Sequence, residues 1–297
     1  MSDSPRLPPD LERDIFELVG QTSSLKTVLP LLRVARRVHE WIEPFLYRSL
    51  NISNLPLSKG PRLDVLLELW RSGTKPPAFF TTAVRHLIIL TPEHAQPEFD
   101  EIVAACSRVT HIAIGPNARA SLPTILRSMP CVRRLAMDFA GATGFRPEAY
   151  SDTTSLQAAA AHLLPALTHL EIFTQLTNDP ATVQRLLPFL RALPRLTHVA
   201  FNFDLVFAVV DALRGMPSLR VICWLASRDS VDTLEYARQL QAQPWQADEP
   251  RIVVLEYDRW YDGAEPFERT YWDRADDLVE QKRRGEIPAT AVYAPGA

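Results

Sequence analysis

A six-residue phrase recurs along this chain, and its spacing restricts the possible folds more than any other feature. Each copy has apolar residues at its first, fourth and sixth positions, and the copies occupy residues 84–89, 109–114, 132–137, 167–172, 196–201 and 219–224. The alternation at the end of each copy is typical of a half-buried strand. Repeats with a period of roughly 20 to 50 residues predict a solenoid, in which stacked copies bury one continuous core.

The segments between the copies have helical patterns, at residues 122–129, 156–164, 182–193 and 205–216. One strand and one helix per repeat predict an α/β fold with a curved parallel sheet and helices outside. An apolar run at 252–255 predicts a seventh strand. The phrases resemble leucine-rich repeats over residues 80–260, although the asparagine that usually follows the strand is matched only by Asn202.

Histidine occupies the third position of four copies, at His86, His111, His169 and His198. In stacked strands this position recurs in register on the inner, concave side of the solenoid. A row of histidines could bind a metal or respond to pH, or duplication could have copied histidine for packing alone. Arg134 and Val221 interrupt the row and only Glu171 adds a carboxylate, so we favour packing over metal binding. The same face predicts a target surface of His86, His111, Arg134, His169, Glu171 and His198.

Catalytic patterns are missing from the sequence. It has 10 glycines, none of them clustered, so no glycine-rich loop could hold a phosphate group. It also has no Gly-x-Ser-x-Gly elbow and no His-Glu-x-x-His pair. We therefore expect a binding protein without a cofactor, and not an enzyme.

The first fifty residues predict a separate module of three short helices. Pro8 and Pro9 mark the first start, since proline suits the first turn of a helix, and an apolar stripe follows at Leu7, Leu11, Ile15 and Leu18. Residues 20–24 predict a break, residues 29–42 a second helix that ends at Pro44, and Phe45 the start of a third.

This module is too small to bury a complete core alone, so the rest of the chain or a partner helix has to cover its apolar face. If the module is a cap on the solenoid, the stripe of Leu11 and Ile15 should lie on the first strand, near Val84. If it docks a partner, the stripe should be exposed to water.

The module resembles an F-box. In that family a Leu-Pro start leads the first helix, and the second helix ends in valine, a small residue, basic residues and an aromatic, as in Val34-Ala35-Arg36-Arg37 followed by Trp41. The resemblance implies docking to a Skp-type adaptor of a cullin complex, with the repeats holding a protein target for a ubiquitin ligase. The implied adaptor-binding residues are Leu7, Pro8, Leu11, Ile15, Phe16, Val34, Arg37 and Trp41.

As a whole, the chain resembles the F-box and leucine-rich-repeat proteins of mushroom-forming fungi. The alternative is a leucine-rich-repeat scaffold that binds a protein without a ubiquitin role.

Residues 257–272 hold six aromatic residues. They could contact the target, with Trp260 and Tyr261 as candidates, or they could cap the last repeat, which we favour. Residues 273–285 predict a charged helix.

The net charge, the cysteines and the length of the apolar runs exclude further classes of protein. With 32 basic and 35 acidic residues the net charge is -3, so nucleic acid is not an expected partner. Cys106, Cys131 and Cys223 predict buried, reduced thiols, and no apolar run is long enough for a membrane span. We therefore expect an intracellular protein, cytoplasmic or nuclear.

The predicted divisions are a helical module at 1–52, a linker with a short helix at 53–80, a solenoid at 81–257 and a cap and tail at 258–297.

Overall fold

The computed structural model of the chain describes residues 7–23, 25–52, 63–89, 97–115, 126–137, 160–173, 180–202, 207–227, 233–242, 249–257 and 270–293. Within these residues, eight strands form one sheet in sequence order, and every neighbouring pair is parallel. The predicted α/β solenoid with N-terminal helices is confirmed. The strands are β1 (Ser49–Ile52), β2 (His86–Ile89), β3 (His111–Ile114), β4 (Arg134–Met137), β5 (His169–Ile172), β6 (His198–Phe201), β7 (Val221–Ser227) and β8 (Ile252–Tyr257).

Each of the six phrases supplies one strand, which begins at the third position of the phrase. The apolar run at 252–255 is also a strand, β8, as predicted. The sheet has one strand more than predicted, because β1 pairs with β2 in the register of Ser49 opposite His86. The sheet therefore starts inside the segment that the sequence assigns to the N-terminal module.

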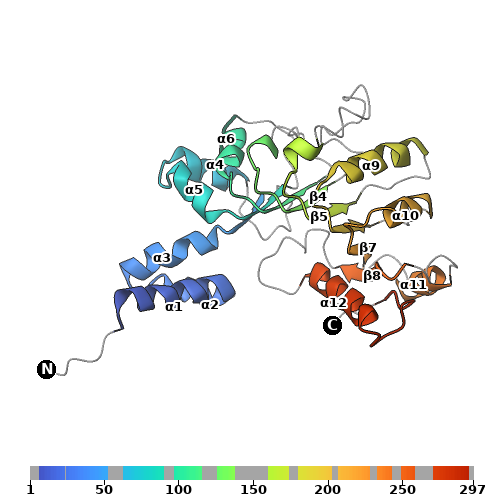
Figure 1. Cartoon of the computed structure of the whole chain (residues 1–297). Coiled ribbons are helices and arrows are strands. Elements are labelled where there is room, and N and C mark those ends of the chain that lie inside the picture. Colours follow the sequence, from blue (N-terminus) through green and yellow to red (C-terminus); the bar gives the residue numbers. More distant parts are fainter. Residues whose placement is uncertain are drawn as a thin grey trace.

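The main core lies between the sheet and the helices on its outer side (Figure 1). In β2 and β5 the second and fourth residues, such as Leu87 and Ile172, belong to this core and are fully buried. Each such side chain contributes roughly 1.5–3 kcal/mol by leaving water. The helices of the repeats are α4 (Leu63–Arg71), α5 (Pro77–Ala83), α6 (Pro97–Ala105), α9 (Pro180–Ala192), α10 (Phe207–Arg214) and α11 (Thr233–Gln241).

Helices α9 and α10 confirm the helical patterns at 182–193 and 205–216. The patterns at 122–129 and 156–164 lie partly outside the described residues. The predicted linker at 53–80 contains α4 and the start of α5, while its residues 53–62 are outside the described part of the chain.

Three helices precede β1, as predicted, but two of their boundaries differ: α1 (Pro9–Thr22), α2 (Leu25–Leu31) and α3 (Arg36–Leu46). The chain breaks between α2 and α3, so the single helix predicted for residues 29–42 is wrong. The expected third helix from Phe45 is also wrong, because α3 continues through Pro44 to Leu46. Phe45 and Leu46 pack on the apolar cluster of the module, and this packing outweighs the backbone bond that proline removes.

The N-terminal helices have a small core of their own, separate from the main core. Val28, Val38 and Ile42 are buried, and Phe16 and Trp41 pack against them. Gly20 is the buried residue of α1, and the Phe45 ring lies so close that a Cβ atom at Gly20 would be 2.6 Å from it. In Figure 1 these helices project from the β1 end of the sheet.

The last described helix, α12 (Tyr271–Arg283), confirms the helix predicted near the C-terminus. Thr270 and Asp273 form a capping box at its start, in which each residue satisfies a backbone N–H group of the other. The helix lies on the inner face of the sheet, against Ala200, Val221, Cys223, Leu225, Val253 and Leu255. One end of the concave face is therefore covered by the chain itself.

Two of the three cysteines agree with the predicted buried thiols. Cys106 and Cys223 are buried, whereas Cys131 is exposed, so the prediction is wrong there. Cys131 lies in the turn before β4, outside the core that surrounds the other two. Among the helices that the structure describes, none is long and apolar enough to cross a membrane.

Candidate functional site

The predicted histidine row exists and is in register across the sheet. His86 pairs with His111, His111 with Arg134, Arg134 with His169, and His169 with His198. The rings of His86 and His111 lie 4.4 Å apart, and those of His169 and His198 stack at 4.0 Å with nearly parallel planes. Arg134 separates the two histidine pairs, as the sequence indicated.

A threonine precedes three of these histidines and holds each ring. The hydroxyl groups of Thr110, Thr168 and Thr197 lie 2.7–2.8 Å from Nδ1 of the next residue. Each hydroxyl also donates to a carbonyl oxygen of the preceding repeat. Because a hydroxyl has one hydrogen, Nδ1 of His111 and of His169 is the donor in its pair. The threonines therefore link neighbouring repeats, and each one also holds the histidine ring that follows it.

His111 and His169 are neutral at physiological pH. Burial lowers the pKa of His111 to about 2, helped by His86 and by the positive charges of Arg134, Arg48 and Arg133. Burial also lowers the pKa of His169 to about 2. Among the described residues, no group of three His, Cys, Asp or Glu side chains could hold a metal ion. Packing within the solenoid is the role that this geometry supports.

Helix α12 covers the β5–β6 end of the row. The ring of Trp272 lies edge-on to His169, and the Tyr271 hydroxyl donates to Glu171 at 2.6 Å. Asp276 lies 3.1 Å from Nε2 of His198. Glu171 and His198 are each 3% exposed. These two predicted target residues are therefore covered, and no surface remains at either of them for a partner.

Much of the inner face across β2–β4 is also buried. Ile88, Ala113 and Ala136 are buried, and so is His86. Of the predicted target residues, His111, Arg134 and His169 are partly exposed. Trp260 and Tyr261 lie outside the described residues. That these side chains form one target surface stays a prediction. Among the described residues, it now applies only to His111, Arg134 and His169, which are partly exposed.

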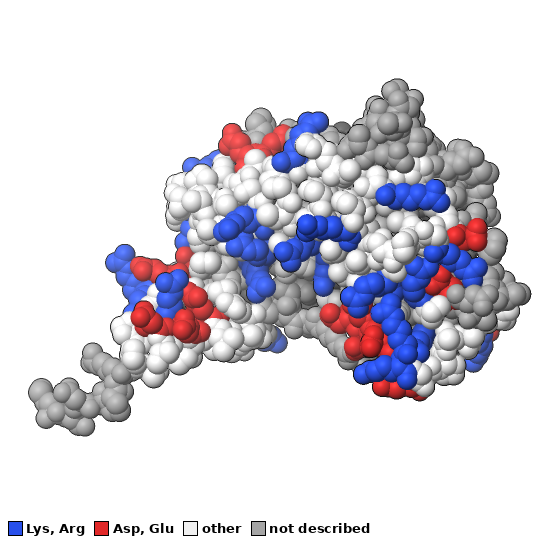
Figure 2. Space-filling view, in the orientation of Figure 1, with Lys and Arg blue, Asp and Glu red and all other residues white. Residues whose placement is uncertain are grey.

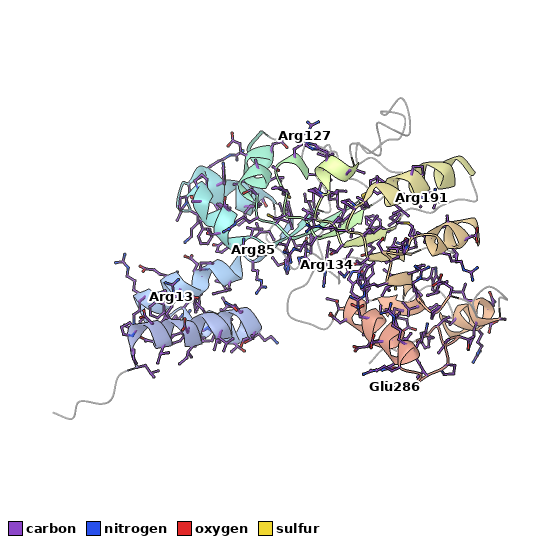
Figure 3. The ribbon with its side chains drawn as sticks, viewed as in Figure 1. Arg13, Arg85, Arg127, Arg134, Arg191 and Glu286 are labelled. Atoms are coloured by element: carbon purple, nitrogen blue, oxygen red, sulfur yellow. The ribbon has the colours of Figure 1, made fainter. Side chains whose placement is uncertain are left out.

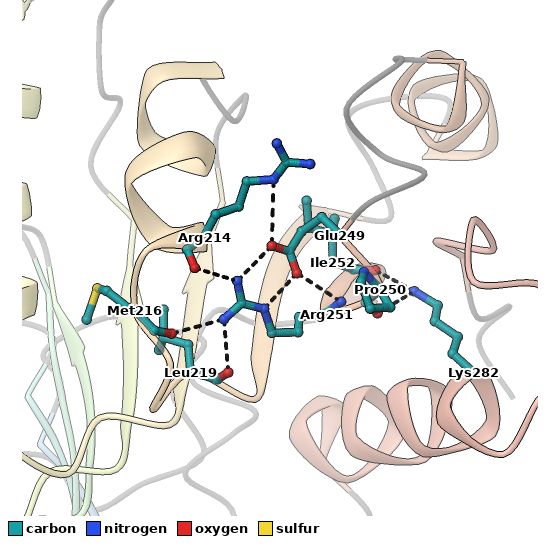
Figure 4. Close-up of polar contacts among 8 residues, drawn as sticks. All are labelled: Arg214, Met216, Leu219, Glu249, Pro250, Arg251, Ile252 and Lys282. Atoms are coloured by element: carbon teal, nitrogen blue, oxygen red, sulfur yellow. Dashed lines mark hydrogen bonds and ion pairs between the residues drawn. The ribbon is translucent and has the colours of Figure 1, made fainter.

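A buried polar network fastens the last repeat (Figure 4). Arg251 forms two bonds to the Glu249 carboxylate, at 2.6 and 2.7 Å, and donates to the backbone carbonyls of Met216, Leu219 and Arg214. Lys282 of α12 donates to the carbonyls of Pro250 and Ile252, and burial lowers its pKa to about 8. All these partners are internal, so the network is structural.

A cleft of about 500 Å³ opens between the N-terminal helices and the first repeats. Its walls include Trp41 and Phe45 from α3 and the arginines Arg13, Arg48 and Arg85. His86 and His111 also line it. The sequence does not predict this cleft, because the cleft depends on how α3 leads into β1, and Ser49–Ile52 carries no copy of the repeated phrase.

The apolar stripe that starts just before α1 and continues along it is exposed. Leu7, Leu11, Ile15 and Leu18 keep 56%, 51%, 49% and 59% of their surface open to water. Val34, between α2 and α3, is 59% exposed. Pro8, another predicted adaptor-binding residue, is exposed just before α1.

Three other predicted adaptor-binding residues make contacts inside the module. The rings of Phe16 and Trp41 lie 6.4 Å apart and pack on its small core. Arg37 of α3 pairs with Glu12 of α1 through two bonds, at 2.8 and 3.1 Å. These three side chains hold α1 against α3, so they shape the exposed stripe without forming part of it.

Searches of protein-family models and of curated proteins give no match. Among solved structures, the chain is similar to the crystal structure of the leucine-rich repeat-containing protein LegL7 from Legionella pneumophila, with 16% sequence identity and a TM-score of 0.36. The match covers 61% of this chain and 60% of that chain.

Proposed function

We propose that this chain selects a protein target for a cullin-type ubiquitin ligase. Its N-terminal helices dock a Skp-type adaptor, and its repeats hold the target. The chain itself performs no catalytic step, since its part is to bring two proteins together. An adaptor of this type would place that work inside the cell, in the cytoplasm or the nucleus.

The exposed stripe of α1 is the observation that carries this proposal. A cap would lay Leu11 and Ile15 on the first repeat, where Val84 is instead fully buried without them. Four large apolar side chains in one row on a folded module favour a partner that covers them. Covering one such half-exposed leucine or isoleucine contributes on the order of 1 kcal/mol.

Affinity purification of this chain, co-expressed with a Skp-type adaptor, tests the proposal. Ile15→Asp and Val34→Asp should each reduce the recovered adaptor at least about tenfold, because each places a charge in an apolar interface. Val65→Asp is the matched control, since Val65 is an equally exposed valine, on α4. It should leave adaptor recovery unchanged.

The folded state of each variant is checked by its thermal melting temperature. All three positions are exposed, so the free energy of unfolding should change by less than about 1 kcal/mol. If Ile15→Asp and Val34→Asp stay folded and recover as much adaptor as the wild type, adaptor docking is wrong.

The second candidate is a repeat scaffold that binds a protein without a ubiquitin role. It is favoured by the internal contacts of Phe16, Trp41 and Arg37, because three residues of the F-box pattern already have a structural use. A wild-type chain that folds, recovers no adaptor and still captures a defined protein ligand on its repeats would support this candidate.

A further inference from the structure

The strands β1–β4 present a cluster of arginines where each strand begins. The cluster consists of Arg48, Arg85, Arg108, Arg133 and Arg134. Backbone bonds align its members: the carbonyl of Arg48 accepts the N–H groups of Arg85 and His86, and the carbonyl of Thr110 accepts those of Arg133 and Arg134. Neighbouring strands lie about 4.8 Å apart, so the cluster extends roughly 14 Å from β1 to β4.

Three members of the cluster have no acidic partner among the described residues. Arg85 donates to the carbonyls of Thr81 and Val84, and no carboxylate of the described part pairs with Arg85, Arg108 or Arg133. Burial lowers the pKa of Arg85, and the nearby Arg108 and Arg48 lower it further. Positive charge therefore accumulates here in a chain whose net charge is -3.

Figure 2 shows Lys and Arg side chains gathered across the middle of this face, and Figure 3 places Arg85 and Arg134 in that strip. The cleft between α3 and the first repeats adjoins it and contains Arg48 and Arg85. Two carboxylates also line the cleft, but Glu17 pairs with Arg13 at 2.6 Å and Glu40 with Arg36 at 3.1 Å. The acids of the cleft are thus held by neighbours on their own helices.

We propose that the arginine cluster and the adjoining cleft bind an acidic segment of a protein partner, in extended form. The planar guanidinium group of arginine pairs with a carboxylate through two parallel hydrogen bonds. An extended peptide advances about 3.3 Å per residue, so four or five residues span the cluster, with acidic side chains at alternate positions facing it. A cleft of about 500 Å³ has the size of a typical binding site.

The length of the cluster favours a peptide over nucleic acid. Duplex DNA carries a negative charge about every 1.7 Å and extends in both directions. The duplex therefore presents far more charge than a cluster of roughly 14 Å can pair with, whereas an acidic peptide of four or five residues matches the length of the cluster.

This inference rests on the part of the proposed function that gives the repeats a protein target, and it does not depend on adaptor docking. Fluorescence polarisation with labelled octaglutamate tests it, beside octaglutamine and an oligothymidylate of equal length. The wild type should bind octaglutamate, bind it less tightly as salt increases, and not bind octaglutamine.

The decisive variant is the double charge reversal Arg108→Glu and Arg133→Glu, both at exposed positions. It should weaken octaglutamate binding at least about tenfold. The matched control is Arg127→Glu with Arg191→Glu, which changes the net charge equally on exposed residues that lie away from the cluster in Figure 3. The control should bind octaglutamate with no more than about a twofold loss.

Three outcomes overturn the proposal: a wild type that does not bind octaglutamate, a cluster variant that binds it as tightly as the control, or tighter binding of the oligothymidylate. Adaptor recovery from the same preparations is measured in parallel. If octaglutamate binding fails while the adaptor is still recovered, the acidic-segment proposal is wrong and adaptor docking stands.

Discussion

The hydroxyl group of Tyr271 lies 2.6 Å from a carboxylate oxygen of Glu171, and both side chains are buried. The bond joins the start of α12 to β5 across 100 residues of sequence. Because the surroundings exclude water, burial raises the pKa of Tyr271 well above its ordinary value, and the Glu171 carboxylate raises it further. The phenol therefore stays protonated and donates a hydrogen bond to Glu171, which holds α12 on the concave face.

Removal of this hydroxyl should destabilise the protein. Tyr271→Phe removes one hydrogen-bond donor from the buried Glu171 carboxylate, which costs about 1–3 kcal/mol. The free energy of unfolding, from urea denaturation followed by tryptophan fluorescence, measures the effect. Tyr293→Phe is the control, because Tyr293 donates to Glu256 at a less buried site and its loss should cost less. Equal losses in the two variants would contradict a special role for Glu171.

Acid should weaken the fold through the histidine row. His111 and His169 have an ordinary pKa near 6.5 when unfolded and about 2 when folded. Between these values the unfolded chain binds more protons, so stability falls as pH decreases below 6.5, by at most about 1.4 kcal/mol per pH unit for each histidine.

Melting temperatures measured from pH 7 to pH 4 test this dependence. The double variant His111→Gln and His169→Gln removes both protonation sites, so its melting temperature should fall less steeply with acid than that of the wild type. Carboxylates titrate equally in the two proteins, and the difference between the curves isolates the histidines. Parallel curves would show that the row does not control acid stability.

Gly20 is required where α1 crosses α3. A Cβ atom there would lie 2.6 Å from the Phe45 ring, closer than side chains tolerate, and the ring is held by the small core of the module. Gly20→Ala should therefore destabilise the N-terminal helices by about 1–3 kcal/mol, although alanine favours a helix. Hydrogen exchange of α1 amides measures it, with Gly215→Ala as the control, since Gly215 has only an ordinary 3.4 Å contact. Unchanged exchange in Gly20→Ala would contradict the close approach.

The repeat phrases predicted strand positions well, because each strand is set by local alternation and by pairing with a neighbouring strand of the same apolar pattern. The sequence did not predict β1, since Ser49–Ile52 carries no copy of the phrase and becomes a strand only by pairing with β2. It also missed the position of α12 on the inner face. That position depends on the burial of Tyr271 and Trp272 against the histidine row, a contact between residues far apart in the chain.

The two candidate surfaces also differ in how far the sequence alone predicts them. Exposure of Leu11 and Ile15 could be stated in advance as one of two outcomes, because a single stripe on a short helix has to face either the chain or a partner. The arginine cluster could not be predicted, since Arg85 and Arg133 are 48 positions apart in the numbering and only the parallel register brings their strands into one row.

The cysteines should differ sharply in reactivity, which probes the packing of the repeats. Burial raises the pKa of Cys106 to about 12 and that of Cys223 well above its ordinary value, so neither is a thiolate or within reach of a reagent, whereas Cys131 is exposed. Iodoacetamide should modify Cys131 in the folded protein and reach the other two only in urea, because alkylation needs an accessible thiolate. Mass spectrometry of intact and digested protein counts and locates the adducts, and Cys131→Ser should abolish the reaction of the folded chain. Rapid modification of Cys106 or Cys223 without denaturant would mean that the repeats open far more readily than their close packing implies.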